Sequence, residues 1–228
     1  MVSLSVDSAK GRAVQVRAER TRSLLVVAAA EAFGRHGFRG ATVGEIAAAA
    51  GVSTGALHFH FPTKGDLGAA VQAAGCGKLA DIGARLESRR SHPVQELIDL
   101  SQIVLEWLAR DVTVRVAVRM WHQLPPAVGG APDFCGDWLE RIGALALMTE
   151  RAGVLCEGRA ASSVAASVAG AMVGAELLAG AEGPCRSVAQ VAECWRLLLP
   201  GLVGEAAAAG LNPYGSLRLG AGAVGPRA

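Results

Sequence analysis

The chain has 228 residues, which is long enough for one large core or for two small domains that share an interface. Hydrophobic residues make up 51% of it, but many of these are alanine and only 4% are aromatic, a composition that favours helices. Residues 1–66 carry eight basic and five acidic side chains (+3), whereas the other 162 residues carry 14 and 15 (−1). We therefore predict an all-α fold in which a polyanionic partner meets the amino-terminal part.

Cysteine usage and hydropathy narrow the class of protein further. The five cysteines lie far apart and form no CxxC pair, so we expect reduced thiols in a cytoplasmic protein, with no metal site and no cofactor. The first 14 residues show no signal-peptide pattern. The segment Ala160–Ala181 is long enough to span a bilayer, but it contains Glu176 and three serines and consists mainly of Ala and Gly. We predict a packing helix there and no membrane contact.

In chain order, residues 1–16 are expected to be a flexible arm, and a first helix runs from Arg17 to His36-Gly37. Two short helices follow, and Phe61-Pro62 ends them. Thr63 and Asp66 form a capping box for a fourth helix toward Arg90. Its five glycines lower the stability of this helix. We favour the interpretation that they allow close packing; the alternative is that this helix moves as a lever.

The second half of the chain predicts more helices. One begins at Pro93 and ends at Arg110. The stretch Val112–Val118 alternates with a period of two, as an edge strand does, but its helical neighbours favour a helix. Further helices are expected over 133–152, 160–181 and 187–203, and a disordered tail over 206–228.

The segment from Thr42 to Phe61 has the spacing of a helix-turn-helix. Thr42 and Glu45 form a capping box, Gly51 can adopt the left-handed conformation that ends a helix, and Ser53 is a suitable N-cap for the next one. Leu57 would anchor this second helix in the core. The second helix would then expose Ser53, Thr54, Gly55, His58 and His60, which are short enough to approach a major groove. An ordinary helical hairpin has the same bare spacing.

Residues 19–79 resemble the DNA-binding domain of TetR-type repressors. The matching stretches are Ala28–Phe38, Thr42–Ile46 and Gly51–Lys64. From Arg17 to about Val203 the chain also resembles, more loosely after residue 79, the γ-butyrolactone autoregulator receptors of Streptomyces. The resemblance rests on Gly55–Phe61, Trp138 after a Pro-rich loop, the Gly170/Gly174 helix and Cys194–Gly201.

The resemblance implies a dimeric repressor with a helix-turn-helix domain at 17–78 and a ligand-binding and dimerisation domain at 79–205. A small lactone, furan or antibiotic is expected to release it from operator DNA. The residues expected to contact DNA are Thr42, Val43, Ser53, Thr54, Gly55, Ala56, His58, Phe59, His60 and Lys64. Thr54 and His58 replace the Lys and Tyr that are usual in the family, so the operator is not expected to be that of relatives. Lys64 matches the residue that clamps phosphate.

The same resemblance indicates the effector site and the dimer interface. Trp138 falls at the family's pocket tryptophan, Ser167 at a ligand-bonding threonine, and Gly75 at a pocket glutamine, so one polar contact is missing. Trp121 is a further candidate, and Glu176 is a ligand group, an interface contact or solvent-facing. We expect the last two helices to form the dimer interface through Gly170, Gly174, Trp195, Leu199 and Leu202.

Three functions remain in view. A butyrolactone-responsive repressor is slightly favoured over a pseudo-receptor that answers to an antibiotic or another metabolite. An architectural DNA-binding protein without ligand is disfavoured by the large carboxy-terminal part. An enzyme is not expected, because the histidines are dispersed and we find no nucleophile elbow, paired-carboxylate site or phosphate-binding glycine loop.

Overall fold

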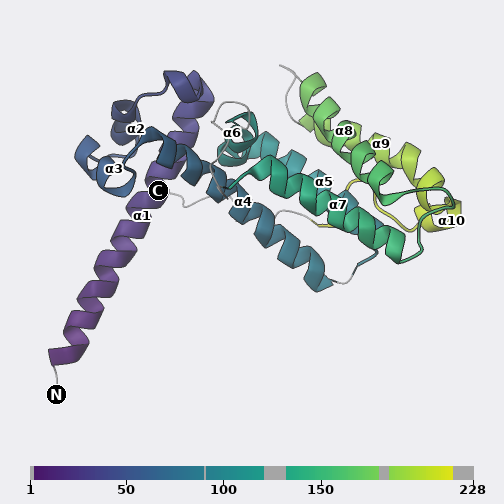
Figure 1. The fold of residues 1–228 in the computed structure, drawn as a ribbon, viewed down its shortest axis with the longest axis horizontal. Helices are drawn as coiled ribbons and strands as arrows, with labels where there is room; N and C mark the ends of the chain where they lie inside the picture. Colours follow the sequence, from purple (N-terminus) through teal and green to yellow (C-terminus); the bar gives the residue numbers. More distant parts are fainter. Residues whose placement is uncertain (1–2, 90, 121–131, 180–184, 218–228) are drawn as a thin grey trace.

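A computed structural model describes residues 3–89, 91–120, 132–179 and 185–217, and within these ranges every regular element is a helix. The helices are α1 (Ser3–Gly40), α2 (Val43–Ala49), α3 (Thr54–His60), α4 (Lys64–Arg89), α5 (Pro93–Arg110), α6 (Val112–Met120), α7 (Phe134–Arg151), α8 (Ala161–Ala179), α9 (Cys185–Val203) and α10 (Glu205–Ala208). Figure 1 shows a small head of α1 to α3 at one end and a longer helical body at the other. The prediction of an all-α fold is confirmed.

Helix α1 differs from the prediction at its start and agrees with it at its end. It is already helical from Ser3, so the expectation of a flexible arm over 1–16 is wrong for the described part. The physical reason is that residues 3–16 contain no proline, and most of them are compatible with a helix. At the other end Gly37 has φ +70°, which breaks the helix at the predicted place.

The head has its own hydrophobic core. Phe33 of α1, Ile46 of α2 and Leu57 of α3 are buried together with residues of the first two turns of α4, down to Val71. Met120 of α6 also packs into this core, so a helix from the middle of the chain contacts the head. The head is therefore joined to the body through both α4 and α6.

The body is built around α5, whose inner residues are buried on all sides. Its core begins at Leu79 of α4 and includes residues of α6, α7, α8 and α9 that pack with α5. Val112–Met120 is helical, which confirms the favoured prediction of a helix over an edge strand. Its alternating valines still serve two cores, because Val116 faces the head and Val114 faces the body.

The carboxy-terminal segment is ordered against α5, which corrects the prediction of a disordered tail for residues 206–217. After α10 the chain returns to α5, where buried polar side chains bind it. Asp99 has no exposed surface and accepts hydrogen bonds from the backbone amide and the hydroxyl of Ser216. Gln95 exchanges two hydrogen bonds with the backbone of Asn212. Residues 218–228 lie outside the described residues.

Candidate DNA-binding interface and effector core

The helix-turn-helix forms with the predicted caps. The Thr42 backbone amide donates to a Glu45 carboxylate oxygen at 3.0 Å, and the Glu45 amide donates to the Thr42 hydroxyl at 3.2 Å. These bonds hold the pKa of the Glu45 carboxyl below its usual range. Gly51 turns the chain with φ +69°, and the Ser53 hydroxyl accepts from the Ala56 amide at 3.1 Å. Both helix starts are confirmed.

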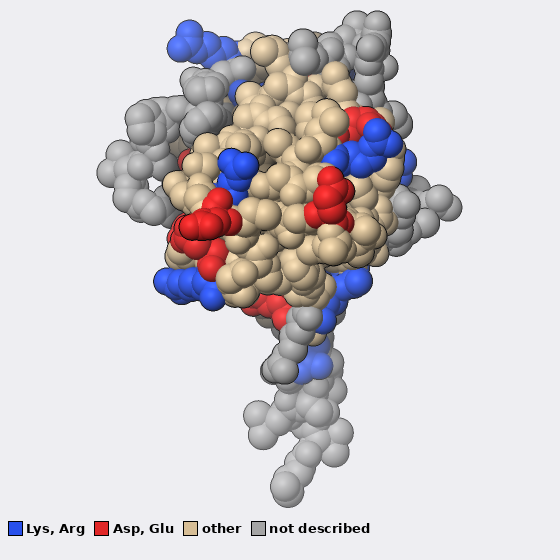
Figure 2. Space-filling view, turned by 90° about the vertical axis from the view of Figure 1, so that its right-hand side faces the viewer, with Lys and Arg blue, Asp and Glu red and all other residues tan. Residues whose placement is uncertain are grey.

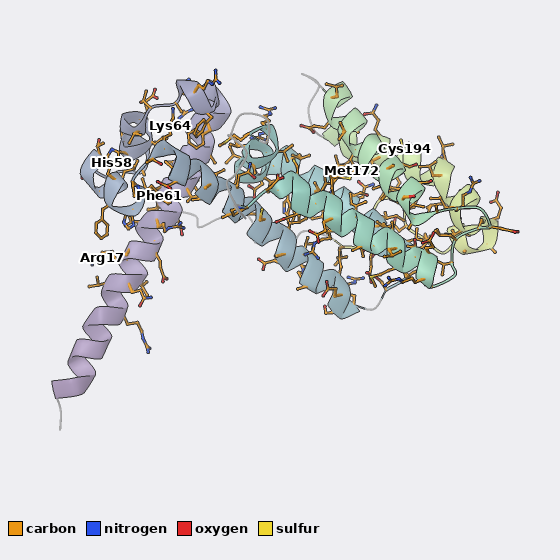
Figure 3. All side chains as sticks on the ribbon, viewed as in Figure 1. Arg17, His58, Phe61, Lys64, Met172 and Cys194 are labelled. Carbon is orange, nitrogen blue, oxygen red and sulfur yellow. The ribbon has the colours of Figure 1, made fainter. Side chains whose placement is uncertain are left out.

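The packing of α3 decides which residues face outward. Leu57 is fully buried against the head core, so the opposite side of this short helix is turned to solvent. Phe59 is 84% exposed there. The other residues expected to contact DNA are exposed or half-buried: Thr42, Val43, Ser53, Thr54, Gly55, Ala56, His58 and His60. Figure 3 shows His58 at the outer edge of the head, away from the body.

Two polar side chains of this surface are partly engaged within the protein. His58 Nδ1 lies 3.1 Å from the Pro62 carbonyl oxygen, which can only accept, so Nδ1 carries the proton. The Nε2 atom of the neutral ring then offers an acceptor, and only the protonated ring offers DNA phosphate a donor.

Lys64 is the second engaged group. Its Nζ donates to the carbonyl oxygens of Arg39 at 3.2 Å and Ala41 at 3.1 Å, and it lies 5.1 Å from the centre of the Phe38 ring. This ammonium therefore ties α4 to the end of α1, a role that the sequence did not indicate. The expectation of a plain phosphate clamp is corrected accordingly, because at most one of its three donors is left for DNA.

A glutamine joins three helices between head and body. The side chain of Gln72 on α4 is buried, its Nε2 donates to the Ala117 carbonyl of α6 at 2.8 Å, and its Oε1 accepts from the Phe134 amide of α7 at 3.2 Å. The sequence analysis missed this residue. Its position one turn before Gly75 and two turns before Leu79, on the same face, was the available signal.

Gly75 lies at a point of close contact between α4, α6 and α7. A Cβ atom at this position would lie 3.1 Å from the Phe134 ring and 3.2 Å from the Ala117 side chain. The space that a longer side chain would need is filled by these two residues, and a contact of Gly75 with a ligand stays a prediction. The missing side chain allows α6 and α7 to approach α4.

Trp138 carries the strongest signal for a ligand in the body. It lies on α7, one turn after Phe134, and its side chain is 8% exposed in the body core. Its Nε1 is buried, and no hydrogen-bond partner is found for it among the described residues. A buried indole N–H normally has an acceptor, so this donor is free to bind one.

The other expected ligand residues do not gather around Trp138. Ser167 lies on the exposed face of α8, because Val164, Val168 and Met172 occupy the inner face, so its expected place beside a ligand in the core is wrong for a single protomer. Glu176 is half-buried on the same helix. Trp121 lies outside the described residues.

A cleft of about 360 Å³ opens between α4 and α7. Charged side chains on α7 line one wall and Cys76 lies on the α4 side. Burial, with a further contribution from Asp137, raises the pKa of the Cys76 thiol to about 12. Trp138 does not line this cleft.

The outer face of α8 and α9 differs from the predicted dimer interface. Trp195 is only 2% exposed and its Nε1 donates to the Ser101 hydroxyl of α5 at 2.9 Å, and Leu199 is equally buried. Both belong to the protomer's own core, so their assignment to the interface is wrong. Gly170 is exposed, and Gly174 and Leu202 are half-buried.

Large apolar side chains are nevertheless exposed on these two helices. They are Val173 and Leu177 on α8 and Leu197 and Leu198 on α9. Much of the surface at this end of the molecule carries neither basic nor acidic side chains (Figure 2). Within the described ranges, no helix is both long enough and apolar enough to cross a membrane.

Comparison with known proteins agrees with this arrangement. Residues 25–71 match the family model described as bacterial regulatory proteins of the tetR family. The chain is 28% identical to the A-factor receptor protein of Streptomyces griseus over 211 residues, which cover 92% of this chain and 73% of the relative.

Solved structures show the same likeness. A crystal structure of a γ-butyrolactone receptor, an ArpA-like protein, superposes with a TM-score of 0.72 at 26% identity, covering 84% of this chain and 93% of the other. CprB of Streptomyces coelicolor, a TetR family protein solved in complex with its biological operator sequence, gives 0.69 at 27% identity, covering 85% and 93%. The chain thus has an amino-terminal domain like that of the tetR family and is similar, along most of its length, to the γ-butyrolactone receptors.

Proposed function

We propose that this protein is a repressor that binds operator DNA as a homodimer and is released by a small γ-butyrolactone-like signal. The similarity to a receptor named for A-factor and to γ-butyrolactone receptors supports the signal class. The similarity to CprB, which was solved with its operator, supports the DNA partner.

The head supports DNA binding through its geometry. Helix α3 is held from behind by Leu57 and presents small or flat side chains outward, so its backbone can come close to base edges in a major groove. The basic excess of residues 1–66 lies in the same part of the chain. Thr54 and His58 supply hydrogen-bonding groups that differ from the Lys and Tyr usual in the family, so we expect the preferred operator sequence to differ from that of relatives.

The exposed apolar face of α8 and α9 supports dimerisation. Val173, Leu177 and Leu197 would be costly to leave exposed to water, and pairing with a second copy would remove them from it. Gly170 and Gly174 on α8 permit a close approach of the two copies. Two heads at fixed separation can then enter successive major grooves.

The free indole N–H of Trp138 is the observation that carries the proposed effector site. A ring carbonyl of a lactone supplies an acceptor, which this donor does not find among the described residues, and the apolar core around it suits an alkyl chain. A ligand that binds here lies one turn from Phe134, whose amide is bonded to Gln72. A shift of α7 is thereby transmitted to α4 and α6, which both contact the head.

The test measures DNA release. A duplex selected from a random library by the purified protein is bound, and a synthetic γ-butyrolactone with a short alkyl chain is titrated in. We expect release, and we expect Trp138→Phe to raise the concentration for half-release about tenfold, the value of one hydrogen bond of about 1.4 kcal/mol. Trp107→Phe is the matched control, because Trp107 is also 8% exposed in the same core but its N–H is not among the buried polar groups that lack a partner.

The outcomes separate the alternatives. Release by lactones, weakened only in Trp138→Phe, supports the proposal. Release by an antibiotic and by no lactone would instead favour a pseudo-receptor of the same family. This alternative is also favoured at position 75, where the chain has glycine in place of the family's pocket glutamine and the Phe134 ring occupies the space. Binding that no small molecule reverses would identify an architectural DNA-binding protein.

A further inference from the structure

The first part of α1 projects from the head without packing against it. From Arg12 to Leu24 no side chain described in this stretch is buried, and the first buried residue is Leu25. We call Ser3–Leu24 the amino-terminal arm. At 1.5 Å per residue its 22 residues extend roughly 33 Å. Figure 1 shows it leaving the head at the end that also carries α3, opposite to α8, α9 and α10.

The arm is basic, and three of its described arginines are uncommitted. Arg12, Arg17 and Arg20 are exposed, and none of them forms an ion pair with any residue that the structure describes. Arg17 and Arg20 are three residues apart and therefore share one face of the helix. Over Ser3–Arg22 the sequence has five basic and two acidic side chains, a balance of +3.

The arm is held at one point next to α3, the proposed recognition helix. The Arg22 guanidinium lies 4.8 Å from the centre of the Phe61 ring, and Phe61 is the C-cap of α3. Arg20 and Arg17 follow on the arm at about 3 and 7.5 Å along its axis from Arg22, and Arg12 at about 15 Å. In Figure 3 Arg17 lies on α1 just below the recognition helix.

Apolar partners do not fit this helix. Its exposed valines, Val14 and Val16, are separated by two residues and so point about 200° apart around the helix. They do not form an apolar stripe that a protein groove or a membrane surface requires. What the arm presents is a set of exposed guanidinium groups, of which Arg17 and Arg20 share one face, and such groups bind phosphate oxygens.

We propose that the amino-terminal arm binds the phosphate backbone of DNA that flanks the site contacted by α3, and this inference rests on the proposed function. The 15 Å between Arg22 and Arg12 match about four to five base pairs of B-DNA. The arm adds affinity that depends on salt and on flank length but not on flank sequence, because phosphate contacts carry no base readout. In a dimer both half-sites gain such a flank.

The test compares two duplexes and two variants. The selected duplex is used once with ten base pairs beyond each α3 footprint and once trimmed at the footprint's edge. The variant is Arg12→Gln, Arg17→Gln, Arg20→Gln combined. The control combines Arg85→Gln, Arg89→Gln and Arg110→Gln, three arginines that are equally exposed but lie on the body. Affinity is measured between 50 and 300 mM salt, and far-UV circular dichroism checks that helix content is kept.

We expect the control to behave as wild type. On the long duplex the arm variant loses up to about 3 units of the salt slope per protomer, roughly 0.9 per phosphate contact, and on the trimmed duplex it equals wild type. Equal slopes for variant and wild type on the long duplex would overturn the inference. So would a loss of the same size on the trimmed duplex, because the arginines would then act within the core site. If the wild type binds the trimmed duplex and the flanks add no affinity, only the inference about the arm is overturned. If the wild type binds no duplex, the proposed function itself is overturned.

Discussion

At the residue scale, burial determines the chemistry of two cysteines on facing helices. Burial raises the pKa of the Cys135 thiol to about 12, with a smaller effect from Asp133, and the Cys76 thiol has the same value. Because the folded pKa lies above the unfolded value of about 8.5, the stability that the two thiols contribute is complete below pH 8.5. It is lost progressively as the pH rises toward 12. Neither thiol is a nucleophile under ordinary conditions.

This difference predicts slow labelling. With iodoacetamide at pH 8, Cys76 and Cys135 should react at least about 100-fold more slowly in the folded protein than in urea, since the thiolate fraction falls by roughly three orders of magnitude. Peptide mass spectrometry at timed intervals measures both sites, and the urea sample is the control. Labelling of either site at the same rate in both samples would show that its thiol is not held protonated.

At the element scale, the polar contacts of Gln72 hold α4, α6 and α7 together. Gln72→Met keeps the length of the side chain but leaves the Ala117 carbonyl and the Phe134 amide buried without partners. We expect the free energy of unfolding to fall by about 2 kcal/mol or more, the cost of two unsatisfied buried groups. We also expect ligand to release DNA less effectively, because α7 is no longer bonded to α4. Denaturant unfolding and the release assay measure the two effects.

Gln15→Met is the matched control for that prediction, because Gln15 is exposed on the amino-terminal arm. It should leave the free energy of unfolding unchanged within about 0.5 kcal/mol. A Gln72→Met protein as stable as wild type, with unchanged release, would show that the three helices are held by their apolar contacts alone.

The carboxy-terminal segment gives a second element-scale prediction. Ser216→Ala removes the hydroxyl that donates to the fully buried Asp99 at 2.7 Å, while the backbone amide of residue 216 still bonds to the same carboxylate. Loss of one hydrogen bond to a charged group should lower the free energy of unfolding by about 1.5 to 3 kcal/mol. Ser162→Ala on the exposed side of α8 should have no measurable effect. Equal stability of the two variants would mean that residues 212–216 do not stay docked on α5.

Local signals in the sequence predicted more of this structure than long-range ones. The capping boxes at Thr42 and Thr63 and the turn at Gly51 depend on neighbours within four residues, and all of them form as predicted. By contrast, α9 has apolar residues on more than one face. Its sequence alone therefore did not indicate whether Trp195 contacts α5, as it does through Ser101, or a second copy of the chain. The docking of the tail on Asp99 joins residues more than 100 positions apart, which no local pattern records.

At the scale of the whole molecule, the function requires two heads at a fixed separation. Each head contributes only a seven-residue recognition helix, so a single copy has a small DNA contact. When a dimer binds, the second head is already near its half-site, and this effective concentration raises the overall affinity by about 10² to 10⁴. In the proposed dimer, the exposed face of α8 and α9 is thus as important for DNA binding as the recognition helix itself.

Leu177→Glu tests this dependence on the last two helices. Leu177 is 79% exposed on α8, so the substitution should not disturb the protomer's core, but it places a charge in the proposed interface. We expect sedimentation at the mass of one protomer and a loss of operator affinity of at least about 100-fold. Leu139→Glu is the control, because Leu139 is an exposed leucine on α7, outside this face. A Leu177→Glu protein that stays dimeric and binds like the control would mean that the two heads are held together by another surface.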